Sequence, residues 1–204
     1  MPPTLLIATG NAGKLREFST LLAPLNIAGP AALDLDLEVE EDGTTFAANA
    51  LLKARAFAQA GQCIALADDS GLEIDALDGA PGVYSARYGG PGLDDAQRCQ
   101  LVLEQLASVP PAKRQARFRC CLAATAPDGR ICHAEGTFNG HIALAPAGSQ
   151  GFGYDPVFYL PQYDKTLAQL SRSEKNRRSH RGQAIAAIRP LLHRTFPELG
   201  PAPA

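Results

Sequence analysis

Two adjacent acidic residues after an apolar run constrain this sequence more than any other feature. The run 63–67 is typical of a short buried strand, and Asp68 and Asp69 follow it directly, ahead of a Ser-Gly pair. We expect the strand to end at the acids and to present them at the edge of a sheet, where α/β folds commonly bind ligands. Because neighbouring strand residues point to opposite faces, the two acids are expected to have different roles. The alternative is that both cap a turn and face solvent.

The composition is that of a globular protein with a substantial core. The chain has 204 residues, of which 46% are hydrophobic, and its formal net charge is −2. This charge gives no overall field that would attract nucleic acid or an anionic membrane. No apolar run approaches the roughly 20 residues that cross a bilayer, and the five cysteines form no C-x-x-C pair. We expect a cytoplasmic protein with no membrane and no stable nucleic-acid partner.

The segment Thr9–Lys14 reads T-G-N-A-G-K and lies between an apolar strand at 5–8 and a helix. A strand, a glycine-rich turn and a helix in this order direct backbone N–H groups at an anion. Lys14 falls in the first helical turn, where the helix dipole disfavours a cation, so an anionic partner is indicated. The segment is not a Walker P-loop, since no hydroxyl residue follows the lysine. The alternative is an ordinary turn in which Asn11 caps the helix.

An acidic turn at 38–45 follows. Carboxylate oxygens are the ligands that Mg²⁺ takes together with substrate phosphates, so Glu40 or Glu41 is a candidate metal ligand. The ordinary explanation of such a segment is a solvated run of charges. The two glutamates remain equal candidates on this reasoning.

A helix is expected from Phe46 to about residue 60, with Thr45 as its N-cap and Gly61 at its end. Lys53 shares a face of this helix with Asn49, four residues earlier. From that face the lysine could bind a phosphate or support a carboxylate. Alone, a lysine in such a position is more often a surface residue.

The middle of the chain predicts further strands and one more helix. Residues 72–77 indicate a hairpin-like element, and a helix is expected to open at Asp94 and Asp95 and to end before Pro110. Strands are expected at 117–125 and around residue 131, with β structure continuing to residue 145. An Asp-Gly pair between these two strands predicts a tight turn.

The segment 151–156 reads G-F-G-Y-D-P. Glycines on both sides of Phe152 allow the backbone to approach a flat ligand, and Phe152 or Tyr154 could stack on a base for about 1–3 kcal/mol. Gly153 and Asp155 belong to the same candidate loop. The alternative is a core aromatic residue held in a loop.

A polar, basic segment at 171–182 precedes a final helix whose apolar residues lie between 184 and 192. Lys175, His180 and Arg181 could bind the phosphates and the polar edge of a ligand, since arginine offers a rigid fork of donors. The alternative is a solvated helix start capped by Ser179.

Taken together, four motifs make the chain similar to the inosine triphosphate pyrophosphatase family, in particular its bacterial dITP/XTP pyrophosphatases. They are T-G-N-x-x-K at 9–14, A-D-D-S-G-L at 67–72, G-F-G-Y-D-P at 151–156 and S-H-R-G at 179–182. The resemblance runs from about residue 5 to 192. Each motif is weak alone, and their occurrence together in this order is specific.

The resemblance implies a Mg²⁺-dependent pyrophosphatase that removes non-standard purine nucleotides. It implies an α/β fold with an elongated, mixed, twisted central sheet, flanking helices and two lobes around a substrate cleft, in a homodimer. We place this single two-lobed domain at 1–196 and expect a flexible tail at 197–204. The reaction would cut the triphosphate of ITP, dITP, XTP or dXTP between the α and β phosphates, giving a monophosphate and pyrophosphate.

The resemblance also implies roles for particular residues. Asp69 would be the proton acceptor and a metal ligand, with Glu40 or Glu41 as a further ligand of Mg²⁺. The substrate-binding residues would be Thr9, Gly10, Asn11, Ala12, Gly13, Lys14, Ser70, Phe152, Gly153, Tyr154, Asp155, Lys175, His180 and Arg181, and to these the helix-face reasoning adds Lys53. We expect Asp69 mainly to orient a metal-activated water, with modest basicity of its own.

Two other functions remain open. One is a pyrophosphatase for other modified bases, as in the Maf-like proteins, which the motifs at 151–156 and 179–182 disfavour. The other is a nucleotide- or RNA-binding module without catalysis, which the basic residues at 172–181 permit. The acids at 40, 41, 68 and 69 count against binding alone, since they would repel phosphate unless a metal intervened.

Overall fold

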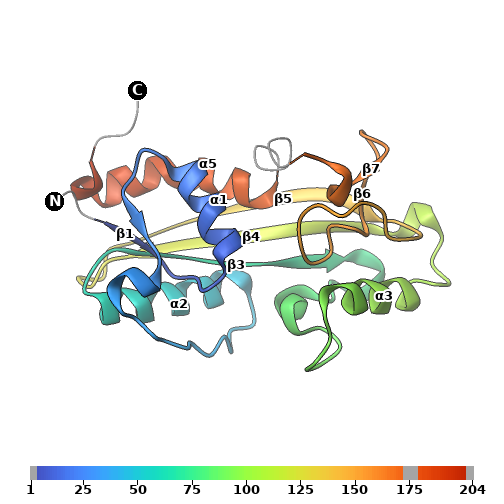
Figure 1. Cartoon of the computed structure of the whole chain (residues 1–204), viewed down its shortest axis with the longest axis horizontal. Coiled ribbons are helices and arrows are strands. Elements are labelled where there is room, and N and C mark those ends of the chain that lie inside the picture. Colours follow the sequence, from blue (N-terminus) through green and yellow to red (C-terminus); the bar gives the residue numbers. More distant parts are fainter. Residues whose placement is uncertain (1–3, 172–178, 201–204) are drawn as a thin grey trace. The chain divides into compact units, whose positions relative to one another are not determined.

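A seven-stranded sheet organises residues 4–171 and 179–200, which are the residues that the computed structural model describes. Its spatial order is β2-β1-β3-β4-β5-β6-β7 (Figure 1). The strands are β1 (Leu5–Ile7), β2 (Ile27–Ala28), β3 (Ala65–Ile74), β4 (Gln115–Thr125), β5 (Ile131–Ile142), β6 (Phe158–Leu160) and β7 (Lys165–Thr166). The α-helices are α1 (Ala12–Leu22), α2 (Phe46–Gly61), α3 (Asp95–Gln105) and α5 (His180–Thr195). Short 3₁₀ segments are η1 (Pro30–Leu33), η2 (Asp75–Leu77), η3 (Gly82–Arg87), η4 (Pro111–Lys113), η5 (Leu167–Gln169) and η6 (Pro197–Leu199).

The sheet is mixed, as expected. Strand β1 pairs in parallel with β2 and with β3, and the β1–β3 register sets Leu6 opposite Ala65. Strand β6 pairs antiparallel with both β5 and β7. Parallel pairs need crossover connections, and here α1 and α2 lie in the chain between the parallel strands. The prediction of an α/β fold with flanking helices is therefore confirmed.

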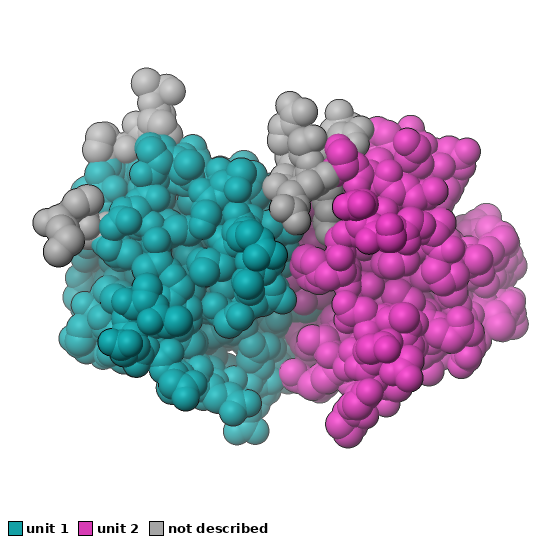
Figure 2. Space-filling view, viewed as in Figure 1, with its two compact units in different colours: residues 1–69, 120–136, 181–204 teal, residues 70–119, 137–180 magenta. Residues whose placement is uncertain are grey.

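The chain divides into two compact units, shown in different colours in Figure 2. Unit 1 comprises residues 1–69, 120–136 and 181–204. In this unit α1 and α5 cover one face of the sheet and α2 covers the other (Figure 1). The apolar residues of α1 and α5, among them Phe18 and Ile188, pack on β1, β3, β4 and β5 to form its core.

Unit 2 comprises residues 70–119 and 137–180 and has a hydrophobic core of its own. Helix α3 contributes Cys99 and Val102 to this core, and its C-cap residue Leu106 joins them. They pack with Phe118 of β4 and with Phe158 of β6, whose ring centroids are 4.6 Å apart. The segment 151–156, called the aromatic loop below, is anchored in the same core by Tyr154.

Two helix starts agree with the sequence, and one helix end does not. Asn11 caps α1 and Thr45 caps α2, and the side-chain oxygen of each accepts backbone N–H bonds of the first turn. At the end of α2 the left-handed residue is Gln62, with φ of 48°, and not Gly61. A Cβ on Gly61 would lie 3.1–3.3 Å from side chains of Leu6, Leu35 and Cys63, which would have to move by a few tenths of an ångström to admit it.

The chain differs from expectation in one further place. The strand predicted to stop at Asp68 continues to Ile74, so the hairpin-like element expected at 72–77 begins as the second half of β3. Of the flexible tail predicted at 197–204, residues 201–204 lie outside the described residues. Its described part contains η6, where Glu198 pairs with Arg130 at 2.6 Å and Leu199 packs on the core of unit 1. Ion pairing and apolar contact hold these residues.

Candidate active site

The two adjacent acids lie inside β3, an inner strand of the sheet, and not at a strand end as the sequence suggested. Their side chains have partners on opposite faces of the sheet, as the alternation of strand residues predicts. Asp68 contacts residues of α1 and α5, whereas Asp69 contacts a residue of α2. Both are buried, with exposed fractions of 2% and 7%. The interpretation of both acids as solvent-facing turn caps is therefore wrong.

Asp68 is the centre of a buried ion-pair network. Its Oδ2 lies 2.9 Å from Nζ of Lys14 and 3.3 Å from a terminal nitrogen of Arg181. Arg181 in turn pairs with Glu17 of α1 at 2.5 Å. Burial alone would raise the pKa of Asp68, but the charges of Lys14 and Arg181 outweigh it and hold that pKa well below its usual range. Asp68 is therefore a permanent anion that orients two cations.

One hydrogen-bond donor of Arg181, its Nε–H, has no acceptor among the described residues. Arg181 is 3% exposed, and this Nε–H is buried. Its terminal nitrogens are engaged by Glu17 and Asp68. A buried donor without an acceptor is costly, and a ligand oxygen would satisfy it.

The loop Thr9–Lys14 joins β1 to α1 and is pinned by its own cap. The side-chain oxygen of Asn11 accepts the backbone N–H groups of Gly13 and Lys14 at 2.8 and 3.0 Å. The backbone N–H of Asn11 donates to Oγ1 of Thr9 at 3.2 Å. A Cβ on Gly13 would come within 3.0 Å of the capping oxygen. The Asn11 cap, which was the alternative to anion binding, is therefore present in the loop that is predicted to bind an anion.

Asp69 faces α2, where Asn49 holds it. The amide nitrogen of Asn49 donates to Oδ2 of Asp69 at 3.0 Å, and the amide oxygen accepts the N–H of Gly43 at 2.8 Å. Burial raises the pKa of Asp69 to about 6; the hydrogen bond from Asn49 opposes this shift and the charge of Glu41 adds to it. A carboxyl with a pKa near neutrality is a better proton acceptor than an ordinary aspartate.

Asn49 and Glu17 contact the predicted site residues Asp69 and Arg181, and the sequence did not indicate either of them. Asn49 is fully buried in the apolar stripe of α2, between Phe46 and Ala50. A polar residue on an apolar helix face was the available signal, because buried amides almost always have partners. Glu17 gave no comparable signal, since an acid within a helix is common, although in the structure it is half-buried and lies in the second turn of α1.

Lys53 and Glu41 complete this side of the site. Lys53 forms an ion pair with Glu41 and also donates to the backbone oxygen of Asp68 at 3.1 Å. Glu41 is half-buried, while Glu40 is exposed. Of the two candidate metal ligands, Glu41 is therefore the one whose charge acts on Asp69.

The carboxylates fit a divalent cation only in part by themselves. Among residues 4–171 and 179–200, no group of three or more His, Cys, Asp or Glu side chains is placed to hold a metal ion. Glu41 and Asp69 nevertheless form a pair of hard oxygen donors whose mutual repulsion a cation would relieve. Mg²⁺ is commonly bound by one or two carboxylates, with substrate phosphates as further ligands, and Glu41 and Asp69 could supply the carboxylates of such a set.

The aromatic loop lies in unit 2 and separates the two aromatic candidates. Tyr154 is buried, and its hydroxyl donates to the backbone oxygen of Ser85 at 2.8 Å, so it is a core residue of the loop. Phe152 is 44% exposed. Asp155 accepts the N–H of Phe152 at 3.0 Å through its carboxylate. Of the two rings, that of Phe152 is therefore the more exposed.

The remaining predicted residues fall in different places. His180 is buried in unit 2, where its ring stacks on Phe118 with centroids 4.9 Å apart. Ser70 is half-buried in β3. Lys175 lies outside the described residues. Unit 1 thus unites the loop at 9–14 with Lys53, Asp69 and Arg181, and unit 2 holds the aromatic loop, Ser70 and His180.

A family model decides the classification of the chain, since it matches residues 5–191. The chain belongs to the Ham1 family. Its relatives include a dITP/XTP pyrophosphatase of Nitratidesulfovibrio vulgaris, 52% identical over 193 residues that cover 91% of this chain and 93% of the relative. A dITP/XTP pyrophosphatase of Escherichia coli K12 is 47% identical over 90% of this chain and 94% of its own.

Solved Ham1 structures agree with the fold. The Ham1 protein of Staphylococcus aureus superposes with a TM-score of 0.85 at 41% identity, over 93% of this chain and 98% of that one. A HAM1 protein from Coxiella burnetii gives 0.86 at 41% identity, over 94% and 99%. The family resemblance inferred from the four motifs is confirmed.

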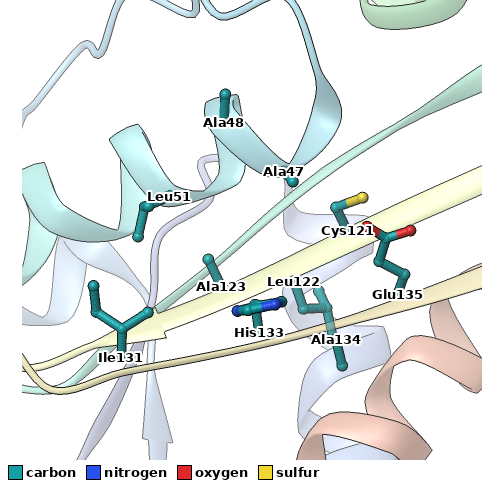
Figure 3. Close-up of a pocket in the computed structure, with 10 residues that line it drawn as sticks. All are labelled: Ala47, Ala48, Leu51, Cys121, Leu122, Ala123, Ile131, His133, Ala134 and Glu135. Carbon is teal, nitrogen blue, oxygen red and sulfur yellow. The ribbon is translucent and has the colours of Figure 1, made fainter.

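A separate pocket of about 250 Å³ lies in unit 1 between α2 and the strands β4 and β5 (Figure 3). Its wall is mainly apolar and includes Leu51, Ala123 and Ile131, with His133 and Glu135 as polar members. None of the predicted site residues lines it.

Among the described residues, no helix is long and apolar enough to span a bilayer.

Proposed function

We propose that this protein hydrolyses non-standard purine nucleoside triphosphates, such as dITP and XTP, between the α and β phosphates. The products are a nucleoside monophosphate and pyrophosphate. The observation that carries the proposal is the buried Asp69, with its raised pKa, on the same strand as a carboxylate that binds Lys14 and Arg181. Relatives about 50% identical over most of the chain are named dITP/XTP pyrophosphatase, which supports it.

The phosphate-binding role belongs to unit 1. The loop Thr9–Lys14 offers backbone N–H groups at the start of α1 together with the ammonium of Lys14, and Lys53 adds a second cation beside Glu41. Asp68 holds Lys14 in place and is not itself the base, because its pKa is held far below neutrality. Charge on a triphosphate is stabilised by such fixed cations.

Asp69 is the proton acceptor. Hydrolysis adds one water across the bond between Pα and the bridging oxygen, and the water must lose a proton as its oxygen bonds to phosphorus. Asn49 fixes the Asp69 carboxylate, which can both orient that water and take its proton. Without a cation, burial raises the pKa of Asp69 to about 6. A bound Mg²⁺ would lower that pKa, so with the cation present Asp69 would act mainly by orienting the water.

Glu41 and Asp69 would hold a divalent cation, for which we propose Mg²⁺. When bound, the cation would neutralise triphosphate charge and lower the pKa of a coordinated water. We prefer Glu41 to Glu40, since Glu41 lies close enough to Asp69 for its charge to raise the pKa of Asp69. A homodimer in the cytoplasm completes the proposal, as the family resemblance implies.

Hydrogen bonding to the 6-position of the purine would distinguish the accepted bases from adenine. Hypoxanthine and xanthine carry a 6-oxo acceptor, whereas adenine carries a 6-amino donor at that position. The buried Nε–H of Arg181 would bind a 6-oxo group and would face a donor in adenine. Unpaired buried polar groups discriminate strongly between ligands. Phe152 is the proposed stacking surface for the base.

The deciding experiment is an incubation of the protein with Mg²⁺ and dITP, beside dGTP and dATP, with separation of all products. Deoxyinosine monophosphate and pyrophosphate from dITP, with much slower turnover of dGTP and dATP, is the expected result. Release of single phosphate would refute the cleavage position, and equal rates with dGTP would refute the selectivity. Nucleotide binding without turnover would favour a binding module.

Asp69→Asn is expected to lower kcat by at least about 100-fold, because an amide cannot accept the proton. The fold should be kept, since asparagine has the same shape and can still bond Asn49. Asp42→Asn, at an exposed acid of the neighbouring turn, is the matched control and should retain turnover. Steady-state kinetics with dITP and urea unfolding of all three proteins provide the measurement. A rate for Asp69→Asn equal to that of Asp42→Asn would remove Asp69 from the mechanism.

A further inference from the structure

The first two turns of α3 hold both peptide groups of Gly153. The Asp95 carboxylate accepts the N–H of Gly153 at 2.7 Å, and the thiol of Cys99 donates to its carbonyl oxygen at 3.4 Å. Asp95 and Cys99 are four residues apart and therefore lie on one face of the helix. All three residues belong to unit 2.

Gly153 has a backbone conformation that needs support. Its φ is 61°, in the left-handed region that side-chain-bearing residues avoid. Glycine reaches this conformation without a steric penalty, but it also leaves it easily, because it has more conformational freedom than any other residue. The two bonds from α3 restrict that freedom at the position next to Phe152.

The remaining bonds of this loop fix its other residues. Asp155 accepts the N–H of Phe152, and its own carbonyl oxygen accepts the N–H of Ala168 at 3.2 Å. The Tyr154 hydroxyl is bonded to Ser85. The loop thus presents the half-exposed Phe152 ring from a backbone that is held on both sides.

Asp95 is not required to start its own helix. Asp94 is the N-cap of α3, and it forms a reciprocal capping box with Gln97, both bonds being 2.8 Å long. The Asp95 carboxylate is thereby left to bind Gly153. Burial, together with the charges of Asp95 and Asp155, raises the pKa of Cys99 to about 11, so its thiol keeps the proton that it donates.

We propose that Asp95 and Cys99 are positioning residues that hold Gly153 and thereby orient the Phe152 ring for stacking on the purine base. The stacking part rests on the proposed function, whereas the holding of the loop does not. A ring fixed before the base arrives loses less conformational entropy on binding. Removal of the clamp should therefore weaken substrate binding more than it slows the chemical step.

The first test uses kinetics with dITP and a matched pair of variants. Asp95→Ala should raise KM by about three- to tenfold with a smaller change in kcat, since it removes the acceptor of Gly153. Asp95→Asn, which keeps an acceptor oxygen, should restore most of the loss. Asp94→Ala removes the helix cap and should lower Tm by about 2–4 °C without raising KM. Equal KM values for Asp95→Ala and Asp94→Ala would overturn the proposal.

The second test does not depend on any activity. The chain contains no tryptophan, so Phe152→Trp supplies a single fluorescent reporter at the loop. In that background Asp95→Ala and Cys99→Ala should lower the fluorescence anisotropy of the reporter, whereas Asp94→Ala and Cys99→Ser should leave it close to the parent value. Unchanged anisotropy in both alanine variants would overturn the clamp, even if dITP is hydrolysed. If dITP is not hydrolysed by the wild type and the anisotropy falls as stated, the clamp stands and the proposed substrate fails.

Discussion

Neighbouring carboxyl groups acquire opposite properties in this protein. Asp68 and Asp69 are both buried, and burial alone would raise the pKa of each. Asp68 meets two cations, Lys14 and Arg181, which overcome that cost and keep it ionised. Asp69 meets a neutral amide and the charge of Glu41, so its pKa rises to about 6. One strand therefore provides a fixed anion on one face and a titratable base on the other.

The raised pKa of Asp69 predicts how stability depends on pH when no divalent cation is present. The folded carboxyl binds its proton more tightly than the unfolded one, so this group lowers stability as pH rises from about 4 to about 6. Raising the pKa of Asp69 from 3.8 to about 6 lowers the free energy of unfolding by about 3 kcal/mol above pH 6.

Asp69→Asn removes this titration. In EDTA its free energy of unfolding, relative to wild type, should increase by about 1–3 kcal/mol between pH 4 and pH 7. The comparison between the two proteins cancels the contributions of Asp68 and the other acids, which titrate in both. Urea unfolding at the two pH values is the measurement. A difference that does not change with pH would mean that Asp69 ionises normally in the folded protein.

Helix α2 is the element that links the acidic turn to the site. It starts at the Thr45 cap, carries Asn49 and Lys53 on one face, and ends in the left-handed residue Gln62. A Cβ on Gly43, just ahead of the helix, would lie 2.5 Å from the amide oxygen of Asn49. The glycine in the acidic turn is therefore needed for the bond that holds Asn49, and through it Asp69.

The end of α2 gives a stability prediction. Gln62→Gly should increase the free energy of unfolding by about 0.5–1 kcal/mol, because glycine adopts a φ of 48° without the penalty of a side chain. The gain is reduced by loss of the bond from the Gln62 side chain to the Gln59 carbonyl, 2.7 Å long. Gln62→Ala is the matched control, because it loses the same bond to Gln59 but keeps a Cβ at this φ, and it should not stabilise. Denaturant titrations of both variants would test this, and stabilisation by Gln62→Ala equal to that by Gln62→Gly would contradict it.

At the scale of the whole molecule, the predicted site residues are distributed over the two units. Unit 1 supplies the charged groups around β3, and unit 2 supplies the aromatic loop and His180. Each has a hydrophobic core of its own, and β3 passes from one unit to the other between Asp69 and Ser70. The long strands β3, β4 and β5 each contribute residues to both units.

The proposed homodimer is tested at this scale. Light scattering coupled to size-exclusion chromatography should give twice the mass of the chain across micromolar concentrations. Addition of EDTA should leave that mass unchanged, since the proposed metal ligands Glu41 and Asp69 belong to the site of one chain. A single-chain mass at every concentration would contradict the homodimer.

The sequence by itself determined the features that depend on local chemistry. The caps at Asn11 and Thr45 and the opposite orientation of Asp68 and Asp69 follow from hydrogen-bonding groups and from the period of a strand. These features need no knowledge of distant residues. The family also followed from short motifs in a fixed order, and the match over residues 5–191 agrees with it.

Only the tertiary structure decided which residues act on the two acids. The approach of Arg181 to Asp68 spans 113 positions, and the contact of Asn49 with Asp69 spans 20. Burial and charge set the pKa of a carboxyl, and both depend on neighbours that are remote in sequence. For the same reason the continuation of β3 past the two acids could not be predicted from the neighbouring sequence. Two adjacent acids inside a buried strand are stable only when the fold supplies partners for them.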